Sequence, residues 1–380
     1  MIYLDNAATS FPKPPGVAEA MVDFLAHSAG NPGRSGHALA LAAQRTVSDT
    51  RRLLASLFDA PDPSRVVFAL NATDAINLAL WGLLRPGDRV VTTGMEHNAV
   101  ARPLHDLAQR GVSVAIVPCA ADGSLDPDDL ALALKAAPTR LVAMTHASNV
   151  TGTILPAREA AGLAHSHGAL FLLDAAQTAG VLPIGVVEMG IDLLAFPGHK
   201  GLLGPTGTGG LYVSPGVKLW PMRQGGTGTR SEEERQPDGL PEGLEAGTVN
   251  TVGIAGLGAA IRYLDYRGME SVRQHEAGLT ERLLEGLKSV PGLHIHGPAD
   301  SRRQVATVSI TLDGWEPVDL GAVLDSSFGI AVRPGLHCAP LAHRTLGTYP
   351  QGTVRFSPGC FSTEEDVDTA IAALRALAFA

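Results

Sequence analysis

The chain has 380 residues and a formal net charge of −9, and 45% of its residues are hydrophobic while only 18% are charged. These values predict a globular protein with a sizeable core and exclude a disordered chain. Lysine and arginine form no runs, so we do not expect nucleic acid or an anionic membrane as a partner.

The three cysteines are odd in number and widely spaced, at Cys119, Cys338 and Cys360. This pattern favours free thiols in a reducing compartment over disulfides or a zinc cluster, and we expect no metal site. The first residues lack the basic and apolar segments of a signal peptide. No apolar run approaches the roughly 18 residues that a membrane span needs. We therefore expect a cytoplasmic protein.

The predicted elements begin with a proline-rich, extended arm and two helices, at residues 17–27 and 38–58. Short apolar runs then alternate with helical segments. The predicted strands are 66–70, 90–93, 114–117, 141–145, 170–173, 193–196 and 211–213, and the helices between them are 74–84, 98–109, 127–136 and 156–167. Runs that are apolar on both faces and separated by helices indicate a mostly parallel, seven-stranded sheet covered on both sides.

The pattern changes after residue 213. A polar, glycine-rich segment at 220–249 is too long for a simple connection, which favours a functional loop or an interface. The elements expected beyond it are helices at 251–267, 268–289, 317–328 and 363–378 and strands at 306–312 and 330–332. We predict an α/β protein with a large domain over residues 16–260. Residues 1–15 and 261–380 would form a smaller α+β domain.

Polar residues follow most strands of the predicted sheet. They lie at 71–73, 96–98, 146–149, 174–177 and 199–200. Ligands of parallel sheets bind outside the carboxyl ends of the strands, so we expect these residues to cluster around one site.

Lys200 directly follows a buried strand and lies next to glycine. Desolvation there would favour a neutral amine, which can form a Schiff base with a carbonyl cofactor. A strand-end lysine that reaches water is the alternative. Asp174 ends the preceding strand, where it would either meet a cationic partner or cap the next turn. A lysine and an acid at neighbouring strand ends are the groups that pyridoxal phosphate requires.

Other strand-end residues have two interpretations each. The helix start at 71–74 would bind a phosphate through free amides and the Thr73 hydroxyl, or would be an ordinary N-cap. His97 would stack on an aromatic ring or be a structural histidine. Asn149 and Gln177 would hydrogen-bond a phenolate oxygen or would tie loops together.

Two residues near the C-terminus complete the set of candidates. Cys338 lies beside His337 and near Arg333, whose charges would raise its thiolate fraction, although an inert thiol is the alternative. Arg355 would clamp a carboxylate with two hydrogen bonds, or would be a surface arginine.

Eight motifs, in this order, resemble those of the class V aminotransferase superfamily, and within it the cysteine desulfurase and selenocysteine lyase branch. They are YLDNAAT (3–9), NATDAIN (71–77), MEHNA (95–99), SNVTG (148–152), DAAQ (174–177), GHK (198–200), EAGTVN (245–250) and RPGLHCA (333–339). The RxGxHC form is more similar to the group II (SufS/CsdA-like) desulfurases than to the NifS/IscS type. The resemblance implies a PLP-dependent transferase of fold type I that forms a homodimer.

The resemblance also implies a role for each matching residue. Lys200 would carry the Schiff base, and Cys338 would form a persulfide. The cofactor would be held by the Ala72 amide, Thr73, His97 stacked on the ring, Asn149, Asp174 at the pyridine nitrogen, Gln177, His199 and, from the partner subunit, Thr248. The substrate would be bound by Asn149, Arg355, Ala8 and His37, with the loop 34–37 and the arm 5–8 as walls of its pocket.

The chain departs from the family pattern at two positions. Pro197 stands where serine is common, and Ala72 stands where threonine is common, so two hydroxyls are missing from the predicted phosphate site.

The expected reaction converts L-cysteine to L-alanine and leaves a persulfide on Cys338, which passes to an acceptor protein or a thiol. The alternatives are a selenocysteine lyase, another PLP-dependent C–S lyase or class V aminotransferase, and a catalytically degenerate scaffold.

Overall fold

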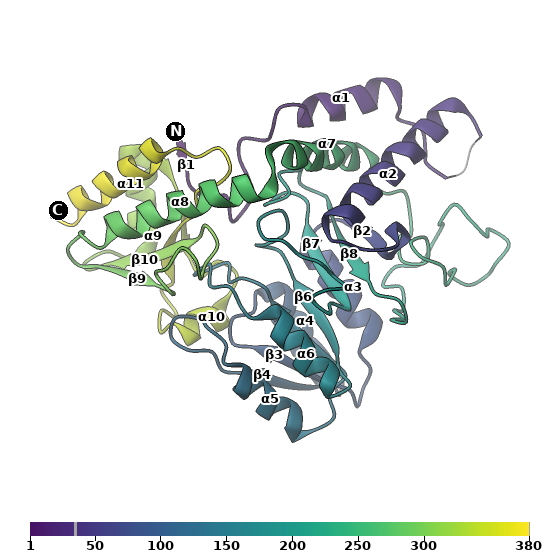
Figure 1. Ribbon diagram of the computed structural model, residues 1–380, viewed down its shortest axis with the longest axis horizontal. Helices are drawn as coiled ribbons and strands as arrows, with labels where there is room; N and C mark the ends of the chain where they lie inside the picture. The colour runs from purple at the N-terminus through teal and green to yellow at the C-terminus, as the bar shows by residue number, and fades with distance from the viewer. Residues whose placement is uncertain (34–35, 380) are drawn as a thin grey trace.

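The computed structural model describes residues 1–33 and 36–379 (Figure 1). Its larger part is built on a seven-stranded sheet with the strand order β2-β8-β7-β6-β5-β3-β4. The strands are β2 (Val66–Ala69), β3 (Arg89–Thr93), β4 (Ser113–Val117), β5 (Leu141–Thr145), β6 (Leu170–Asp174), β7 (Leu193–Pro197) and β8 (Gly209–Val213). Both neighbours of β8 pair with it antiparallel, and the other pairs in this sheet are parallel. The predicted mostly parallel, seven-stranded sheet is confirmed.

Both faces of this sheet are buried, because successive side chains of a strand point to opposite faces. In β5, Leu141 and Ala143 join one hydrophobic cluster, whereas Val142 and Met144 join the other. The first cluster also contains residues of α3 (Ala72–Leu83) and α4 (Asn98–Gln109), and the second contains residues of α2 (Ala38–Leu57), α5 (Pro127–Ala136), α6 (Ala157–Ser166) and α7 (Thr251–Arg267). Among the described residues, none of the helices combines the length and apolar character needed to cross a membrane.

Side-chain caps set the start of the two helices that follow β2 and β3. Asn71 Oδ1 accepts a hydrogen bond from the Asp74 amide at 2.9 Å, and His97 Nδ1 accepts one from the Ala99 amide at 3.0 Å. Because Asn71 is the cap, α3 begins at Ala72, two residues before the predicted start. Both helices therefore turn their first amides toward the carboxyl edge of the sheet.

The smaller part contains a four-stranded antiparallel sheet with the order β12-β13-β10-β9. Its strands are β9 (Leu293–His296), β10 (Val308–Leu312), β12 (Arg333–Gly335) and β13 (Thr353–Phe356). Helices α8 (Met269–Leu287), α9 (Pro317–Phe328) and α11 (Glu364–Leu377) supply its core, while α10 (Pro340–Thr345) lies between β12 and β13 in the chain. The predicted strand 330–332 is observed as β11 (Ile330–Ala331), and β12 begins after it, at Arg333.

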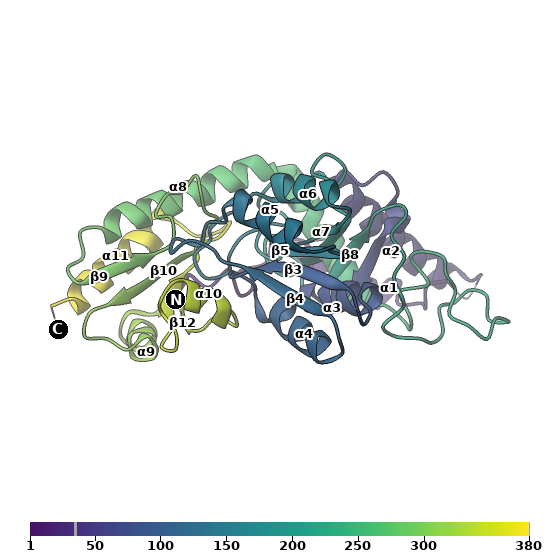
Figure 2. The same cartoon turned by 90° about the horizontal axis from the view of Figure 1, so that it is seen from below.

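The N-terminal arm belongs with this smaller part, because β1 (Ile2–Tyr3) pairs parallel with β11 and Leu4 is buried in the same core. Figures 1 and 2 show α8 running from the large sheet to the small one. Its Val272 lies in the core of the large part, whereas Leu279 lies in that of the small part. The domain boundary at residue 260 stays a prediction, and the packing favours a position inside α8.

Helix α7 is the element that joins the large sheet to the start of α8. It packs against α1 (Val17–His27) and α2, and its Ile261 and Leu264 are buried in the large core. The segment 214–250 that precedes it contains no helix or strand, in agreement with the predicted long loop.

Candidate active site

The carboxyl edge of the large sheet meets the N-terminal arm and the C-terminal segments. These contacts join residues that are far apart in the chain: Ser10 N to His199 O (3.0 Å), Gln177 Nε2 to Ala7 O (3.2 Å), Asn98 N to Cys338 O (2.8 Å), Asn149 Nδ2 to His337 O (2.7 Å) and Arg355 Nη1 to Asn149 O (3.0 Å). The predicted cluster of strand-end residues therefore forms, and residues from both ends of the chain close around it.

Lys200 lies at the end of β7 and is half-buried. Burial and, to a smaller extent, the positive charge of Arg355 lower the pKa of its amine to about 8, and the carboxylate of Asp174 opposes these effects. Its Nζ makes no hydrogen bond within residues 1–33 and 36–379. A substantial fraction of neutral, nucleophilic amine is therefore present near neutral pH, as the predicted desolvation requires.

Lys13 shows that burial alone does not make a free amine. Burial lowers its pKa to about 8 as well. Its Nζ, however, donates to Ser10 Oγ at 2.8 Å and to His199 O at 3.0 Å. Lys13 thus ties the N-terminal arm to the end of β7, whereas the amine of Lys200 is left for a ligand.

Asp174 ends β6 and has only 3% of its surface exposed. Its Oδ1 accepts a hydrogen bond from the Ala176 amide at 2.9 Å, so the predicted turn cap is present. Burial raises the pKa of the carboxyl group, while this hydrogen bond and the charge of Lys200 lower it. Oδ2 has no hydrogen-bond partner in the described part of the chain, which leaves it free for a donor such as a protonated ring nitrogen.

His97 is both a helix cap and a wall of an open groove. Because Nδ1 accepts from the Ala99 amide, the neutral ring carries its proton on Nε2. Burial, and then the positive charges of Lys200 and Arg333, lower its pKa to about 4 and keep it neutral. The groove, of about 460 Å³, is also lined by Thr73 and Cys338.

The start of α3 and the residue before Lys200 fit an anionic group. The amides of Ala72 and Thr73 have no hydrogen-bond partner among the described residues, as expected for the first turn of a helix. Nδ1 of His199 is also buried and has no hydrogen-bond partner among the described residues. A Cβ on Gly209 would lie 2.9 Å from the Asn71 Cα, so this glycine allows β8 to approach the helix start. A phosphate would satisfy these donors.

The two departures from the family pattern remove donors from this same place. Pro197 ends β7 in a buried position opposite Gly209, and Ala72 is 7% exposed. Neither side chain can donate a hydrogen bond. The donors that remain are the two helix amides, the Thr73 hydroxyl and the His199 ring.

Asn149 and Gln177 tie loops together, which was one of their two interpretations. The Asn149 amide donates to the His337 carbonyl oxygen, and that of Gln177 donates to the Ala7 carbonyl oxygen. Both side chains are less than 10% exposed.

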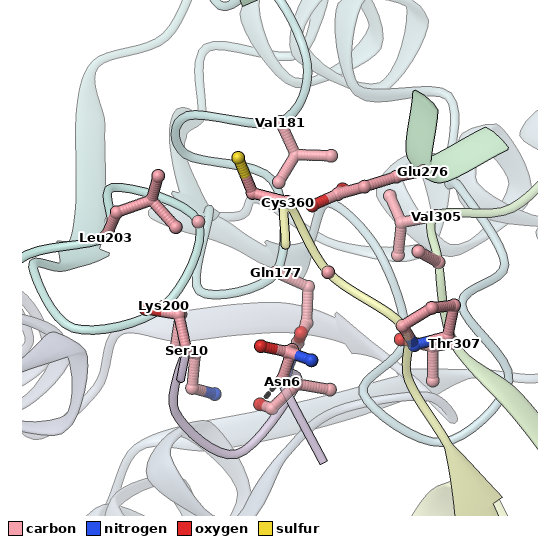
Figure 3. A pocket seen from close by; sticks show the side chains of 15 residues that line it. Asn6, Ser10, Gln177, Val181, Lys200, Leu203, Glu276, Val305, Thr307 and Cys360 are labelled. Carbon is pink, nitrogen blue, oxygen red and sulfur yellow. Dashed lines mark hydrogen bonds between the residues drawn. The ribbon is translucent and has the colours of Figure 1, made fainter. Parts of the chain in front are cut away.

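A small pocket lies beside Gln177 and Lys200. Figure 3 shows Asn6 and Lys200 on one side of it and Glu276 and Cys360 on the other. Its volume of about 40 Å³ has room for a few water molecules and excludes a cofactor ring.

Arg355 is buried on β13, with 1% of its surface exposed, so the interpretation as a surface arginine is wrong. Its Nη2 donates to Asp5 Oδ1 at 2.6 Å and its Nη1 to the Asn149 carbonyl oxygen, while Nε is buried without a partner among the described residues. Burial lowers the pKa of the guanidinium, and Asp5 raises it. Two contacts thus hold the guanidinium in place.

Asp5 is a residue whose role the sequence analysis missed. The arm 5–8 was predicted as a wall of the substrate pocket, without a partner for its carboxylate. Asp5 and Arg355 are 350 positions apart, and only the pairing of the arm with β11 and with Ser357 brings them together. No local signal in the sequence could have revealed this pair.

Cys338 lies at the tip of a backbone turn that ordinary residues avoid. His337 and Cys338 have φ angles of 50° and 57°, a left-handed conformation that costs about 1–2 kcal/mol for each residue with a side chain. The thiol is exposed, and Arg333 Nη2 lies 3.8 Å from its Sγ. The thiol is thus accessible from the groove and lies beside a positive charge.

The other two cysteines have opposite surroundings. Burial raises the pKa of the Cys119 and Cys360 thiols to about 11, and both therefore remain protonated. Of the three thiols, that of Cys338 is the exposed one.

Thr248 and His37 lie away from the Lys200 cluster within this chain. Thr248 is exposed and lines a groove of about 980 Å³ beside α2. His37 caps α2, where its Nδ1 accepts from the Ala40 amide at 3.3 Å, and it is exposed. Their predicted roles stay predictions.

Two further predicted pocket walls remain. Ala8 lies on the arm, with its amide bonded to the Asp5 carbonyl oxygen at 3.1 Å, next to the Ala7 that Gln177 contacts. Residues 34 and 35 of the predicted wall lie outside the described residues.

Comparison with known proteins identifies the family. Residues 2–370 match the family Aminotransferase class-V. The chain is similar to a probable cysteine desulfurase of Methanothermobacter thermautotrophicus, with 38% identity over 96% of this chain and 92% of the relative. It is also similar to the apo structure of a cysteine desulfurase from Thermococcus onnurineus NA1, with a TM-score of 0.92 and 34% identity, covering 100% of this chain and 94% of the other.

A second solved structure is the cysteine desulfurase CsdA (S-sulfonic acid) from Escherichia coli. It matches with a TM-score of 0.87 and 32% identity over 100% of this chain and 95% of the other. The TM-scores show that the fold of this chain is that of these cysteine desulfurase structures. The chain belongs to the class-V aminotransferase family and to its cysteine desulfurase branch.

Proposed function

We propose that this enzyme takes the sulfur atom of L-cysteine onto Cys338 and releases L-alanine. The observation that carries the proposal is the position of the exposed Cys338 thiol. It lies 3.8 Å from the Arg333 guanidinium and lines the same groove as Thr73 and His97. The relatives named as cysteine desulfurases support the reaction, because they cover nearly the whole chain at 34–38% identity.

Pyridoxal phosphate is the cofactor that the site fits. The unpartnered His199 nitrogen and the free amides of Ala72 and Thr73 would hold the phosphate. His97 would stack on the ring, and Asp174 would keep the pyridine nitrogen protonated. When bound, the cofactor supplies an aldehyde that links to Lys200 and a ring that takes up electrons from the substrate Cα.

Side chains of this protein would then bind the substrate and transfer the proton. The Nε edge of Arg355 binds the substrate carboxylate, and Asn149 and Gln177 hold the loops around the substrate. The neutral amine of Lys200 accepts the proton from Cα.

The Cys338 thiolate attacks the substrate sulfur. The new S–S bond forms as the C–S bond breaks, and the electron pair of the C–S bond remains on the carbon. That carbon takes up a proton, Lys200 returns a proton to Cα, and the product leaves as alanine, so the reaction needs no external oxidant or reductant.

A homodimer would complete the site. Thr248 and His37 are exposed on or next to the 980 Å³ groove beside α2, away from the Lys200 cluster of their own chain. In a dimer they would serve the site of the partner subunit, with Thr248 at its phosphate. The persulfide would pass to an acceptor protein or a small thiol, in the cytoplasm.

The test is a product assay on the enzyme loaded with pyridoxal phosphate and given L-cysteine. Cys338→Ala should lower alanine formation about 100-fold or more while the absorbance of the lysine-bound cofactor is retained. Cys119→Ala is the matched control and should keep wild-type rates. Full alanine formation by Cys338→Ala would overturn the assignment of the nucleophile. Pyruvate as the product would instead identify a C–S β-lyase.

A further inference from the structure

A series of hydrogen-bonded side chains runs behind Cys338, from the half-buried Thr348 to the buried His343 and His337, and is not part of the site described above. Thr348 Oγ1 lies 2.7 Å from His343 Nδ1, His343 Nε2 lies 3.3 Å from His337 Nδ1, and His337 Nε2 lies 2.8 Å from the Arg333 carbonyl oxygen. The two imidazoles stack with their centroids 5.4 Å apart and an interplanar angle of 25°. His337 is 3% exposed, and His343 is fully buried.

The direction of every hydrogen bond in this series of side chains follows from its last acceptor, the Arg333 carbonyl oxygen. The Arg333 carbonyl oxygen can only accept, so His337 carries its proton on Nε2, and its Nδ1 accepts from His343 Nε2. Nδ1 of His343 must then accept from the Thr348 hydroxyl. The two rings are neutral, because burial lowers the pKa of His343 to about 4 and that of His337 well below its usual value.

A competing hydrogen bond from Thr348 is weaker. Its hydroxyl lies 3.5 Å from the His343 carbonyl oxygen, at the limit of a hydrogen bond, compared with 2.7 Å to the ring. The ring contact therefore determines the orientation of this hydroxyl. Without the contact from the Thr348 hydroxyl, His343 Nδ1 would be a buried acceptor with no donor. Such unsatisfied polar atoms are rare in folded proteins.

The backbone that this chain supports is the left-handed turn at His337 and Cys338. Such a conformation persists only where the surroundings hold it. The Cys338 carbonyl oxygen is fixed by the Asn98 amide, and the His337 carbonyl oxygen by the Asn149 side chain. The imidazole of His337 is the third anchor, and it depends on His343. The same ring also binds the main chain of Arg333, whose guanidinium contacts the thiol.

We propose that Thr348 and His343 are positioning residues for Cys338. Through His337 they hold the left-handed turn and the Arg333 backbone, so that the thiol and its guanidinium neighbour stay at the groove. The inference rests on the proposed function, since it concerns the same thiol. It adds two residues that touch neither substrate nor cofactor, and it locates part of the reactivity of Cys338 in α10 and the turn after it.

The test compares Thr348→Val, which keeps the shape and removes the donor, with Thr348→Ser, which keeps the donor. The first readout is the rate at which iodoacetamide alkylates Cys338, followed by mass spectrometry of its peptide, in the enzyme loaded with pyridoxal phosphate. The second is kcat and KM for alanine formation from L-cysteine, and the third is the melting temperature.

The proposal predicts a selective loss in Thr348→Val. Its kcat should fall about 10-fold with KM within about 2-fold, as expected for a hydrogen bond that acts on the reacting geometry. The alkylation rate should change about 3-fold or more, and Thr348→Ser should restore both values to within about 2-fold of the wild type.

Other outcomes overturn the proposal. A lower melting temperature with unchanged kcat and alkylation rate would mean a purely structural role. Equal losses in both variants would mean that the hydrogen bond is not the cause. The alkylation readout does not depend on turnover. If Cys338→Ala retained full alanine formation, the proposed function would therefore fail while the positioning of this thiol could still be measured.

Discussion

Lys200 and Cys338 are the two nucleophiles that we propose for the site, and their surroundings are opposite in kind. Lys200 stands at the end of a buried strand, and its reactivity comes from desolvation, which lowers its pKa to about 8. Cys338 is exposed on a left-handed turn, where its thiol lies beside the Arg333 guanidinium. The first group depends on the core of the large sheet, whereas the second depends on hydrogen bonds between loops.

Because of this contrast, Lys200 and Cys338 are held in position by different kinds of contact. Lys200 follows the buried strand β7, and Lys13 adds a local contact through the carbonyl oxygen of the preceding residue, His199. Cys338 is placed by the Asn98 amide and the Asn149 side chain, which come from the other part of the molecule. We expect the lysine to tolerate loop changes that disable the cysteine.

The largest effect is expected from removing the buried amine. Lys200→Ala should lower alanine formation by about 10³–10⁴-fold, because the proton acceptor and the attachment point of the cofactor are lost together. Steady-state rates and the visible absorbance of the lysine-bound cofactor would measure both effects. Lys218→Ala, an exposed lysine, is the control. Substantial activity in Lys200→Ala would show that the reaction does not need the Lys200 amine.

The next effect concerns Arg355, which is buried on β13 and paired with Asp5. Arg355→Lys should raise KM for L-cysteine about 10–100-fold with a smaller change in kcat. An ammonium cannot reach Asp5, the Asn149 carbonyl oxygen and a substrate carboxylate together. Arg282→Lys, on an exposed ion pair with Asp368, is the matched control. An unchanged KM would show that the carboxylate binds elsewhere.

A pH dependence distinguishes the buried lysine from an exposed one. Because the pKa of Lys200 is lowered to about 8, its neutral fraction rises as pH increases toward that value. Uptake of pyridoxal phosphate by the cofactor-free enzyme should therefore accelerate about 10-fold from pH 6 to pH 7, rise less steeply near pH 8 and level off above about pH 9. Rapid-mixing absorbance would follow this reaction. A rate that keeps rising well above pH 9 would mean that the amine is not desolvated.

A smaller effect is expected at Glu96, which is fully buried under the site. Its Oε1 accepts from Thr93 Oγ1 at 2.6 Å and from the Thr145 amide at 3.1 Å, while Oε2 has no partner among the described residues. Burial raises its pKa from 4.5 to about 8. The folded protein therefore holds this proton more tightly than the unfolded chain, and stability falls as pH rises from about 5 to about 8.

Glu96→Gln removes that dependence and keeps the shape of the side chain. The variant should match the wild type near pH 5 and gain on the order of 1 kcal/mol of relative stability for each pH unit up to about pH 8. Denaturant unfolding at three pH values would measure the difference. A constant difference across this range would show that Glu96 is ionised in the folded protein.

Much of the large sheet could be predicted from the sequence, because its strands are apolar on both faces and its helices have clear caps. β5 and the helices α1, α4, α5, α7 and α9 have the predicted bounds. The strands β9 and β13 were missed, since each has only four residues and polar side chains among them. β13 even contains the buried Arg355, and arginine alone does not predict a core strand.

The candidate site likewise has one part that could be predicted from the sequence and one part that could not. The strand-end residues around Lys200 follow from the strand pattern. The pairing of Asp5 with Arg355 and the chain from Thr348 to His337 depend on contacts between distant or irregular segments. The left-handed turn at His337 and Cys338 was also hidden, because neither residue is a glycine.

The most direct test of the account is to find where the sulfur atom goes. The enzyme loaded with pyridoxal phosphate would be mixed with one equivalent of L-cysteine, digested under conditions that preserve persulfides and analysed by mass spectrometry. The account predicts one additional sulfur atom on the peptide of Cys338, in proportion to the alanine released, and none on those of Cys119 or Cys360. Alanine release without sulfur on Cys338, or with sulfur on another cysteine, would contradict it.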